Sequence, residues 1–295
     1  PGFRDAVRSL ADGGAEYVIA EPVGSCTDLS ATILQPLKEH HPDWSVAPLT
    51  VLVDPARLAG VLREQHPRLH ADAAYILRLQ LEEADRILLT KVDTLTDTQR
   101  EEMAAYLKDQ FPHAPVDAIS ALTGEGLEAW LAAVLSQAPA GTRIVDVDYD
   151  RYAHGEAVLG WLNAVLDLRW IGGLEPEWGG FVEQLFSTLR DRLKESGSEI
   201  GHIKMLLETP QGRLVANLTG LQDELKVRQE GTLGRLTAVL TANARVQASP
   251  EETEAVFRNA LKEASYGRVA ATFRAMHCLQ PGRPVPTYRY SAVVK

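Results

Sequence analysis

The tetrapeptide Thr90-Lys-Val-Asp93 follows directly after a run of apolar residues, Ile87 to Leu89. Such a run is typical of a buried strand, so these polar residues mark its carboxyl end. The Asp93 carboxylate can accept two hydrogen bonds from guanine, whereas adenine offers an acceptor at the same ring position and would leave the charge unpaired. The stem of Lys91 can lie across the base plane with its ammonium in water. The pattern favours a guanine-recognition loop; the alternative is an ordinary strand end followed by a loop aspartate.

An apolar stretch over residues 15–21 predicts a second buried strand, which ends at Glu21 and is followed by Gly24. An acid at a strand end can hold Mg²⁺ or its water, and a glycine three residues later can bring its backbone N–H to a phosphate oxygen. These residues suit a sensor for Mg²⁺ and the γ-phosphate. The alternative is a strand, a Pro-Gly turn and a helix over residues 27–40 that Thr27 or Asp28 caps.

Two further apolar runs end in polar residues. Residues 48–53 predict a strand followed by Asp54, which we interpret as a helix cap before Pro55. Residues 116–119 predict a strand followed by Ser120 and Ala121, whose backbone N–H groups can meet the guanine carbonyl oxygen; the alternative is a plain strand-to-helix loop. Four strands, each followed by a helix, predict a doubly wound, mostly parallel α/β sheet, in which ligands bind outside the carboxyl ends of the strands.

The chain is long enough, at 295 residues, for two domains. We expect an α/β domain over residues 1–138, a linker over 139–157 and a smaller α+β domain over 158–295. Within the first domain we expect helices over residues 27–40, 69–83, 96–110 and 125–136, the last with the inward face Leu127, Trp130, Leu131 and Val134. Within the second domain we expect a strand over 158–170, a helix over 177–194, a hairpin over 200–218, a strand over 236–248 and a helix that begins at 249.

Taken together, these motifs resemble the CobW-type GTPases, which are P-loop NTPases related to nickel chaperones. The resemblance rests on the Glu21-x-x-Gly24 pair, the strand before Asp54, the Thr90–Asp93 loop and the Ser-Ala-Leu-Thr-Gly-Glu-Gly-Leu run from Ser120. It covers roughly residues 1–137, and the segments 148–163 and 280–289 also look like parts of that family. The resemblance implies a GTP-binding protein that couples GTP hydrolysis to delivery of a metal or metallocofactor.

The sequence departs from this family at the phosphate site. The family carries a P-loop, Gly-x-x-Gly-x-Gly-Lys-Thr, and a Cys-x-Cys-Cys motif, yet no Gly-Lys pair occurs in this chain and its two cysteines are Cys26 and Cys278. We expect that a segment carrying the P-loop strand and the metal motif precedes Pro1. Pro22 also removes a backbone donor near the expected γ-phosphate position. The competing hypothesis is a catalytically silent binding or scaffold protein that retains the GTPase fold.

The resemblance implies GTP or GDP and Mg²⁺ as ligands, with Zn²⁺ or Co²⁺ as a possible transition metal. Its implied partner is a metalloprotein or an enzyme with a metallocofactor, and a homo-oligomer is also possible. Cys26 is a speculative metal ligand, since a position near the phosphates at a helix N-terminus would lower its pKa; a small residue filling a turn is the alternative. His40 and His41 point in different directions on a helix, so they do not predict a metal site.

Composition narrows the classes of partner. The net charge of −10 and the lack of a basic run argue against nucleic-acid binding. No apolar run is long enough to span a bilayer, and no signal peptide is visible. Two cysteines cannot form a disulfide framework, so we expect a cytoplasmic protein.

Overall fold

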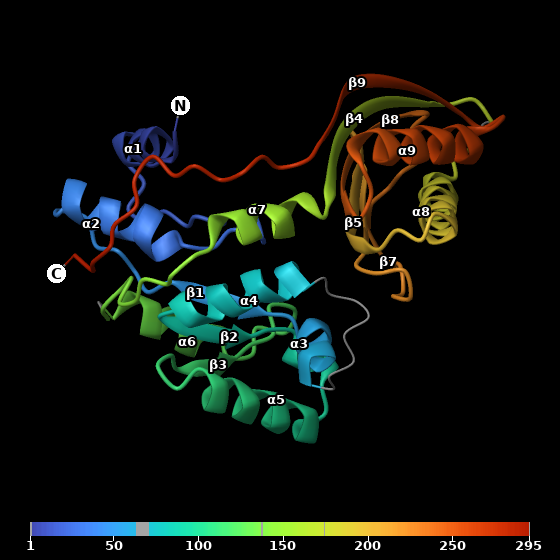
Figure 1. Cartoon of the computed structure of the whole chain (residues 1–295). Coiled ribbons are helices and arrows are strands. Elements are labelled where there is room, and N and C mark those ends of the chain that lie inside the picture. Colours follow the sequence, from blue (N-terminus) through green and yellow to red (C-terminus); the bar gives the residue numbers. More distant parts are fainter. Residues whose placement is uncertain (1, 63–70, 137, 174, 295) are drawn as a thin grey trace.

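The computed structural model describes residues 2–62, 71–136, 138–173 and 175–294. These residues form a mixed α/β structure with two separate sheets, a parallel sheet of three strands and an antiparallel sheet of six strands (Figure 1). The expected mixed α/β class is therefore confirmed.

The parallel sheet consists of β1 (Thr50–Val53), β2 (Arg86–Leu89) and β3 (Val116–Ala118), in that order. Ile87 and Leu89 of the central strand are fully buried, as expected for a strand covered on both faces. The strands predicted before Asp54, Thr90 and Ser120 are thus all present.

Four helices accompany these strands: α3 (Pro55–Leu62), α4 (Ala71–Glu83), α5 (Asp97–Gln110) and α6 (Leu127–Leu135). Figure 1 shows α4 and α5 on opposite sides of the sheet. Helix α5 begins at a capping box in which Thr96 accepts from the backbone of Gln99, in agreement with the predicted start near residue 96. The first two residues of the predicted helix over 69–83 lie outside the described residues.

The predicted strand over residues 15–21 is wrong. The chain starts with α1 (Phe3–Asp12), and residues 15–21 then have no regular structure. Tyr17 and Ile19 are 73% and 91% exposed, because no described strand lies beside this segment. Among the described residues, strand β1 likewise pairs with β2 alone, and Leu52 on it is 62% exposed.

Two helix predictions need correction. The helix predicted over residues 27–40 begins at Ser30, as a π-helical turn (Ser30–Leu34) that continues into α2 (Gln35–His40). Helix α6 has no buried residue, and Leu131 on its predicted inward face is 45% exposed. The apolar face of α6 therefore lacks the cover that its sequence predicts.

The antiparallel sheet has the strand order β7-β6-β5-β8-β4-β9. Its strands are β4 (Gly160–Trp170), β5 (Ile200–Thr209), β6 (Gly212–Leu218), β7 (Lys226–Gly231), β8 (Thr237–Val246) and β9 (Val269–Leu279). Helices α8 (Trp178–Glu195) and α9 (Pro250–Ser265) cover one face of it (Figure 1). The predicted strands, the hairpin and both helices of this half are confirmed, whereas β7 and β9 are additional.

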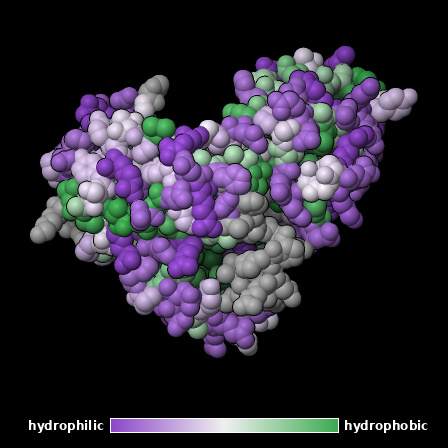
Figure 2. Space-filling model, viewed as in Figure 1, coloured by the Kyte–Doolittle hydropathy of each residue, from purple (hydrophilic) through white to green (hydrophobic). Residues whose placement is uncertain are grey.

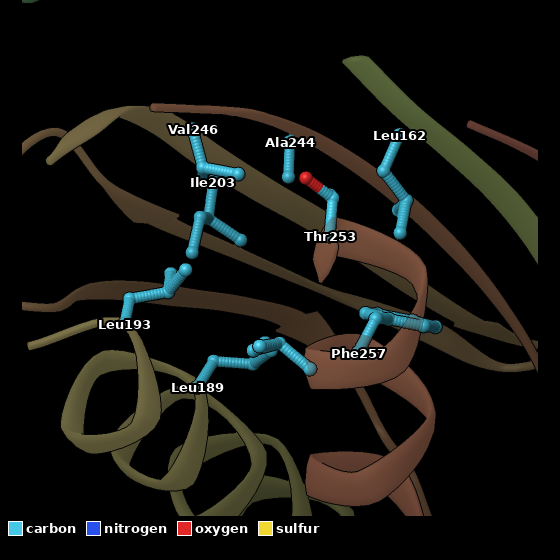
Figure 3. A pocket seen from close by; sticks show the side chains of 9 residues that line it. Leu162, Leu189, Leu193, Ile203, Ala244, Val246, Thr253 and Phe257 are labelled. Atoms are coloured by element: carbon cyan, nitrogen blue, oxygen red, sulfur yellow. The ribbon is translucent and has the colours of Figure 1, made fainter. Parts of the chain in front are cut away.

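The core of this half lies between the two helices and the sheet. Phe181, Leu185 and Leu207 are fully buried in it. Leu189, Leu193 and Phe257 converge on the sheet (Figure 3). Together with neighbouring side chains they line a void of about 10 Å³. Since one water needs about that much room, the void is a packing feature and not a ligand site.

Residues 148–157, placed in the predicted linker, fold into the helix α7 (Tyr149–Ala157). Asp148 caps α7 by accepting from the backbone of Asp150 and Arg151. After β9 the chain runs back over α7 and ends beside α2 (Figure 1). Figure 2 shows two lobes with a largely hydrophilic surface on this face. None of the helices in the described ranges has the length and apolar character needed to cross a membrane.

Candidate functional site

The carboxyl ends of the three parallel strands lie side by side. Val53 is the register partner of Leu89, and Leu89 is the register partner of Ala118. The segments that follow, at Asp54, Thr90 and Ser120, therefore leave the sheet at one edge. The structure brings three of the four predicted motifs together there.

Thr90 and Lys91 fix the shape of the loop after β2. The backbone N–H and the hydroxyl of Thr90 both donate to the carbonyl oxygen of Val53, at 3.0 and 2.9 Å. Lys91 adopts a left-handed conformation with φ of +54°, which is uncommon for a residue other than glycine. The backbone N–H of Val92 then donates to the carbonyl of Ile119 at 3.2 Å. The loop is thereby tied to both neighbouring strands.

Lys91 also forms an ion pair with the acid at the end of β1. Its ammonium lies 2.5 Å from an Asp54 carboxylate oxygen, and the lysine side chain is 53% exposed. Burial favours the neutral form of Asp54, but the hydrogen bond and charge of Lys91 outweigh it and lower the pKa of Asp54. The pair with Asp54 thus holds the Lys91 side chain at the carboxyl edge of the sheet.

Asp93 lies in a 3₁₀ turn (Val92–Thr94) and is exposed. The turn is closed by Thr94, whose backbone N–H and hydroxyl both donate to the Lys91 carbonyl. Within the described part of the chain, no group donates a hydrogen bond to the Asp93 carboxylate. Both of its oxygens are available to a ligand.

The turn after β3 is built around buried Ser120. Its hydroxyl accepts from the backbone of Thr123 at 3.1 Å, and its own N–H donates to the Glu125 carbonyl at 3.0 Å. Gly126 closes the turn with φ of +76°, where a Cβ would lie 2.3 Å from the carbonyl oxygen of Ala118. No described acceptor takes the N–H of Ala121, which is exposed.

These two loops offer a free carboxylate and a free backbone donor at the same edge. A ligand that presents two N–H donors next to a carbonyl oxygen complements that set, and guanine has this pattern on one edge. Adenine does not, because it presents an acceptor where guanine has its ring N–H. Chemically, the arrangement can select between nucleobases by the donors and acceptors on their edges.

Glu21 and Gly24 do not form part of this arrangement. Both are exposed, and no described group bonds to the Glu21 carboxylate. The carbonyls of Gly24 and Cys26 accept hydrogen bonds from the Gln80 side chain of α4, at 3.0 and 2.8 Å. The segment after Gly24 is thus anchored to α4, whereas Glu21 lies free in solvent.

A buried polar cluster lies where that segment meets α4. Glu83 is only 1% exposed, accepts from the Thr27 hydroxyl at 3.0 Å and accepts from the Ser30 backbone at 3.1 Å. Burial raises the pKa of Glu83 to about 7, and the nearby Asp28 charge adds to this, although the hydrogen bonds oppose it. An acid at the end of a helix is usually solvated, so the sequence does not predict this buried role of Glu83.

The neighbouring Asp28 is also buried, at 1% exposure. One of its oxygens accepts from the Tyr149 hydroxyl at 2.5 Å and from the Arg289 guanidinium at 2.7 Å. Burial and the Asp28 hydrogen bond raise the pKa of Tyr149 to about 12. These partners come from α7 and from the C-terminal segment, so no local pattern in the sequence could have identified them.

Cys26 lies beside Tyr152 and Glu156 of α7. Burial and the Glu156 charge raise the pKa of its thiol, which is opposite to the lowering expected from the sequence. Within the described ranges, no three His, Cys, Asp or Glu side chains are placed to hold a metal ion. A role of Cys26 as a metal ligand stays a prediction.

Comparison with known proteins gives few matches. No model of a protein family matches the chain, and no curated protein matches it. Among solved structures, the chain is similar to the Zn(II)-bound YjiA GTPase from E. coli, with 16% identity and a TM-score of 0.26 over 87% of this chain and 75% of that one. A Zn(II)-bound triple mutant of YjiA gives 17% identity and the same TM-score and coverage. Such a TM-score is too low to support an inference about fold or function.

Proposed function

We propose that this chain binds a guanine nucleotide at the carboxyl edge of its parallel sheet. The observation that supports this is that two adjacent loops offer the Asp93 carboxylate and the backbone N–H of Ala121, neither of which has a hydrogen-bond partner among the described residues. Asp93 would accept from the ring N–H and the amine of guanine, and the backbone at Ser120 and Ala121 would support its carbonyl oxygen. Thr90 would hold the loop in shape, and Lys91 would lie across the base.

The complete protein is, in this proposal, a GTP hydrolase of the CobW type that delivers a metal or metallocofactor to a client protein. Hydrolysis requires a phosphate cradle, and the chain contains no Gly-Lys pair to supply it. An additional strand would fit beside β1, because no strand of the described ranges pairs with that edge and Leu52 on it is exposed. The strand-like, exposed residues 15–21 would pair with the same additional strand and bring Glu21 and Gly24 to the phosphates.

Mg²⁺ would bind at Glu21 in this proposal. Mg²⁺ usually takes one or two carboxylates together with phosphate oxygens and water, so a single exposed, unbonded carboxylate fits it. The ion would neutralise charge on the transferred phosphoryl group. The division into a GTPase domain over residues 1–138, a linker over 139–157 and a client-binding domain over 158–295 is part of the same proposal.

Substitution of Asp93 tests the base-reading role. Asp93→Asn replaces one acceptor by an amide donor, which suits the C2 carbonyl of xanthine better than the C2 amine of guanine. Calorimetry should therefore show preference for GDP over ADP and xanthosine diphosphate in the unchanged chain, and a shift towards the xanthine nucleotide in the variant. Asp97→Asn is the matched control, because Asp97 is an exposed acid in the first turn of α5 and should leave the preference unchanged.

Equal binding of GDP and ADP by the unchanged chain would contradict the proposal. So would a guanine preference that survives in the Asp93→Asn variant. The absence of nucleotide binding, both by this chain and by a version extended upstream, would favour the silent binding protein that retains the GTPase fold.

A further inference from the structure

The C-terminal segment, residues 280–294, connects the antiparallel sheet back to the N-terminal part of the chain. It has no helix or strand, yet it makes specific bonds along its length. The Gln280 side chain donates to the carbonyl of Ala157 at the end of α7, at 2.9 Å. Figure 1 shows this segment leaving β9, passing α7 and ending beside α2.

The far end of this segment is fastened to the helix that follows Asp28. The backbone N–H of Tyr290 donates to the carbonyl of Ala31 at 3.0 Å, and that of Val294 donates to the side chain of Gln35 at 2.8 Å. Gln35 is fully buried. Each of these hydrogen bonds joins one residue of the segment to one residue of the π-helical turn or α2. Together they fix how the segment lies along these helices.

Arg289 makes the charged contact in this docking. Its guanidinium lies 2.7 Å from the Asp28 carboxylate and also donates to the carbonyl of Val145 at 2.9 Å. The Asp28 side chain is 1% exposed and the Arg289 side chain 31%. A charged hydrogen bond to a buried carboxylate is worth more than a surface pair, because the carboxylate would otherwise be buried unpaired.

Asp28 also holds an unfavourable backbone conformation. Its φ is +63°, and within the described residues only Lys91 shares a positive φ among residues other than glycine. A left-handed residue of this kind persists when its surroundings over-determine it. Here the surroundings include Tyr149 of α7 and Arg289 of the C-terminal segment, which bond to Asp28 itself. Glu83 of α4 also bonds to Thr27 and Ser30, the near neighbours of Asp28.

We propose that the C-terminal segment is a latch that holds residues 24–30 in their present conformation through the Arg289–Asp28 pair. Release of the segment would free Asp28 to leave the left-handed region, and a change in residues 24–30 would release the segment. The two events are one equilibrium, so each must affect the other equally. A partner that takes up the C-terminal segment would thereby alter the loop that begins at Glu21; this consequence rests on the proposed function.

Hydrogen exchange of the intact chain, followed by mass spectrometry of its peptides, tests the latch without any nucleotide. Arg289→Gln should speed exchange about tenfold or more in residues 24–35 and in 284–294, since a lost charged hydrogen bond changes an opening equilibrium by at least that factor. Arg283→Gln is the matched control. Arg283 lies in the same segment and pairs with Asp150 of α7. Their side chains are 54% and 85% exposed, so exchange should stay within about twofold of the unchanged chain.

Asp28→Asn provides an independent route to the same result. Asparagine tolerates the left-handed conformation but lacks the charge, so this variant should retain the fold even if Arg289→Gln does not. It should speed exchange in the same two peptides, and the double variant should be no faster than the faster single one.

Faster exchange of 284–294 with no change at 24–35 would overturn the latch, as would equal acceleration by Arg283→Gln. Failure to bind GDP together with coupled exchange would remove the proposed function and leave the latch standing. GDP binding without a joint change of exchange in residues 24–35 and 284–294 would support the proposed function and overturn the latch.

Discussion

Replacing Glu83 by glutamine should make the stability of this protein less sensitive to pH. Glu83 is buried, and its carboxylate oxygens accept from the Thr27 hydroxyl and the Ser30 backbone. A glutamine has nearly the same shape, retains one acceptor and can donate to the Thr27 oxygen. The substitution therefore removes the ionisation and little else.

The expected magnitude follows from the pKa. Burial raises the pKa of Glu83 from 4.5 to about 7, so the folded protein binds a proton that the unfolded chain releases between these values. The free energy of unfolding therefore falls as pH rises from 4.5 to about 7 and is flat above. At about 1.4 kcal/mol for each pH unit, the unchanged chain loses about 2.5 kcal/mol between pH 5 and pH 8 through this group.

Urea unfolding at pH 5, 6, 7 and 8 measures this quantity. The stability of Glu83→Gln relative to the unchanged chain should rise by about 2.5 kcal/mol across that range, whatever its offset at pH 5. The comparison cancels the titration of groups that do not interact with Glu83. Glu82→Gln is the control, because Glu82 pairs with Arg78 at the surface. A relative change below about 0.5 kcal/mol would refute the buried ionisation.

Two further pairs of substitutions probe the site and the core. Gly126→Ala should lower the free energy of unfolding by about 2 kcal/mol or more in thermal unfolding, because its Cβ would meet the Ala118 carbonyl. Gly124→Ala should cost about 1 kcal/mol, because Gly124 has a φ of +85° but open space around it. Equal costs would contradict the close approach at Gly126. Leu185→Ala in the fully buried core should lower the free energy of unfolding in urea by about 3 kcal/mol. Leu131→Ala on exposed α6 should lower it by under about 1 kcal/mol. A large loss of stability at Leu131 would show that α6 is covered in solution.

Local sequence patterns predicted those helices and strands whose cause lies within a short stretch of the chain. The buried run before Thr90 gave β2, and the Thr96 and Ser249 capping boxes gave the starts of α5 and α9. The loops after β2 and β3 were also predictable, because parallel strands bring their carboxyl ends to one edge. The strand expected over residues 15–21 failed for the opposite reason: its residues have strand character, but a strand forms only beside a partner.

The elements that were missed lack such patterns. Strand β7 is an exposed, polar edge strand, so it has no alternation of apolar residues. Strand β9 pairs with β4 through an irregular register between Val165 and Leu166, which breaks the two-residue period that a sequence would show. The cluster around Glu83 and Asp28 joins residues from α4, α7 and the C-terminal segment, and only the folded chain brings them together.

The proposed function sets a limit on how tightly this chain would hold a nucleotide. In that proposal, base recognition at Asp93 and Ala121 would amount to about three hydrogen bonds, each worth about 1–3 kcal/mol before the cost of ordering the ligand. Such a site should bind GDP with a binding free energy of about −4 kcal/mol, which corresponds to a Kd near the millimolar range. In GTPases, contacts of the phosphates with a helix N-terminus and with Mg²⁺ supply the remaining binding free energy. Calorimetry at millimolar GDP is therefore the appropriate measurement, and a micromolar Kd for this chain would mean that residues other than the two loops hold the phosphates.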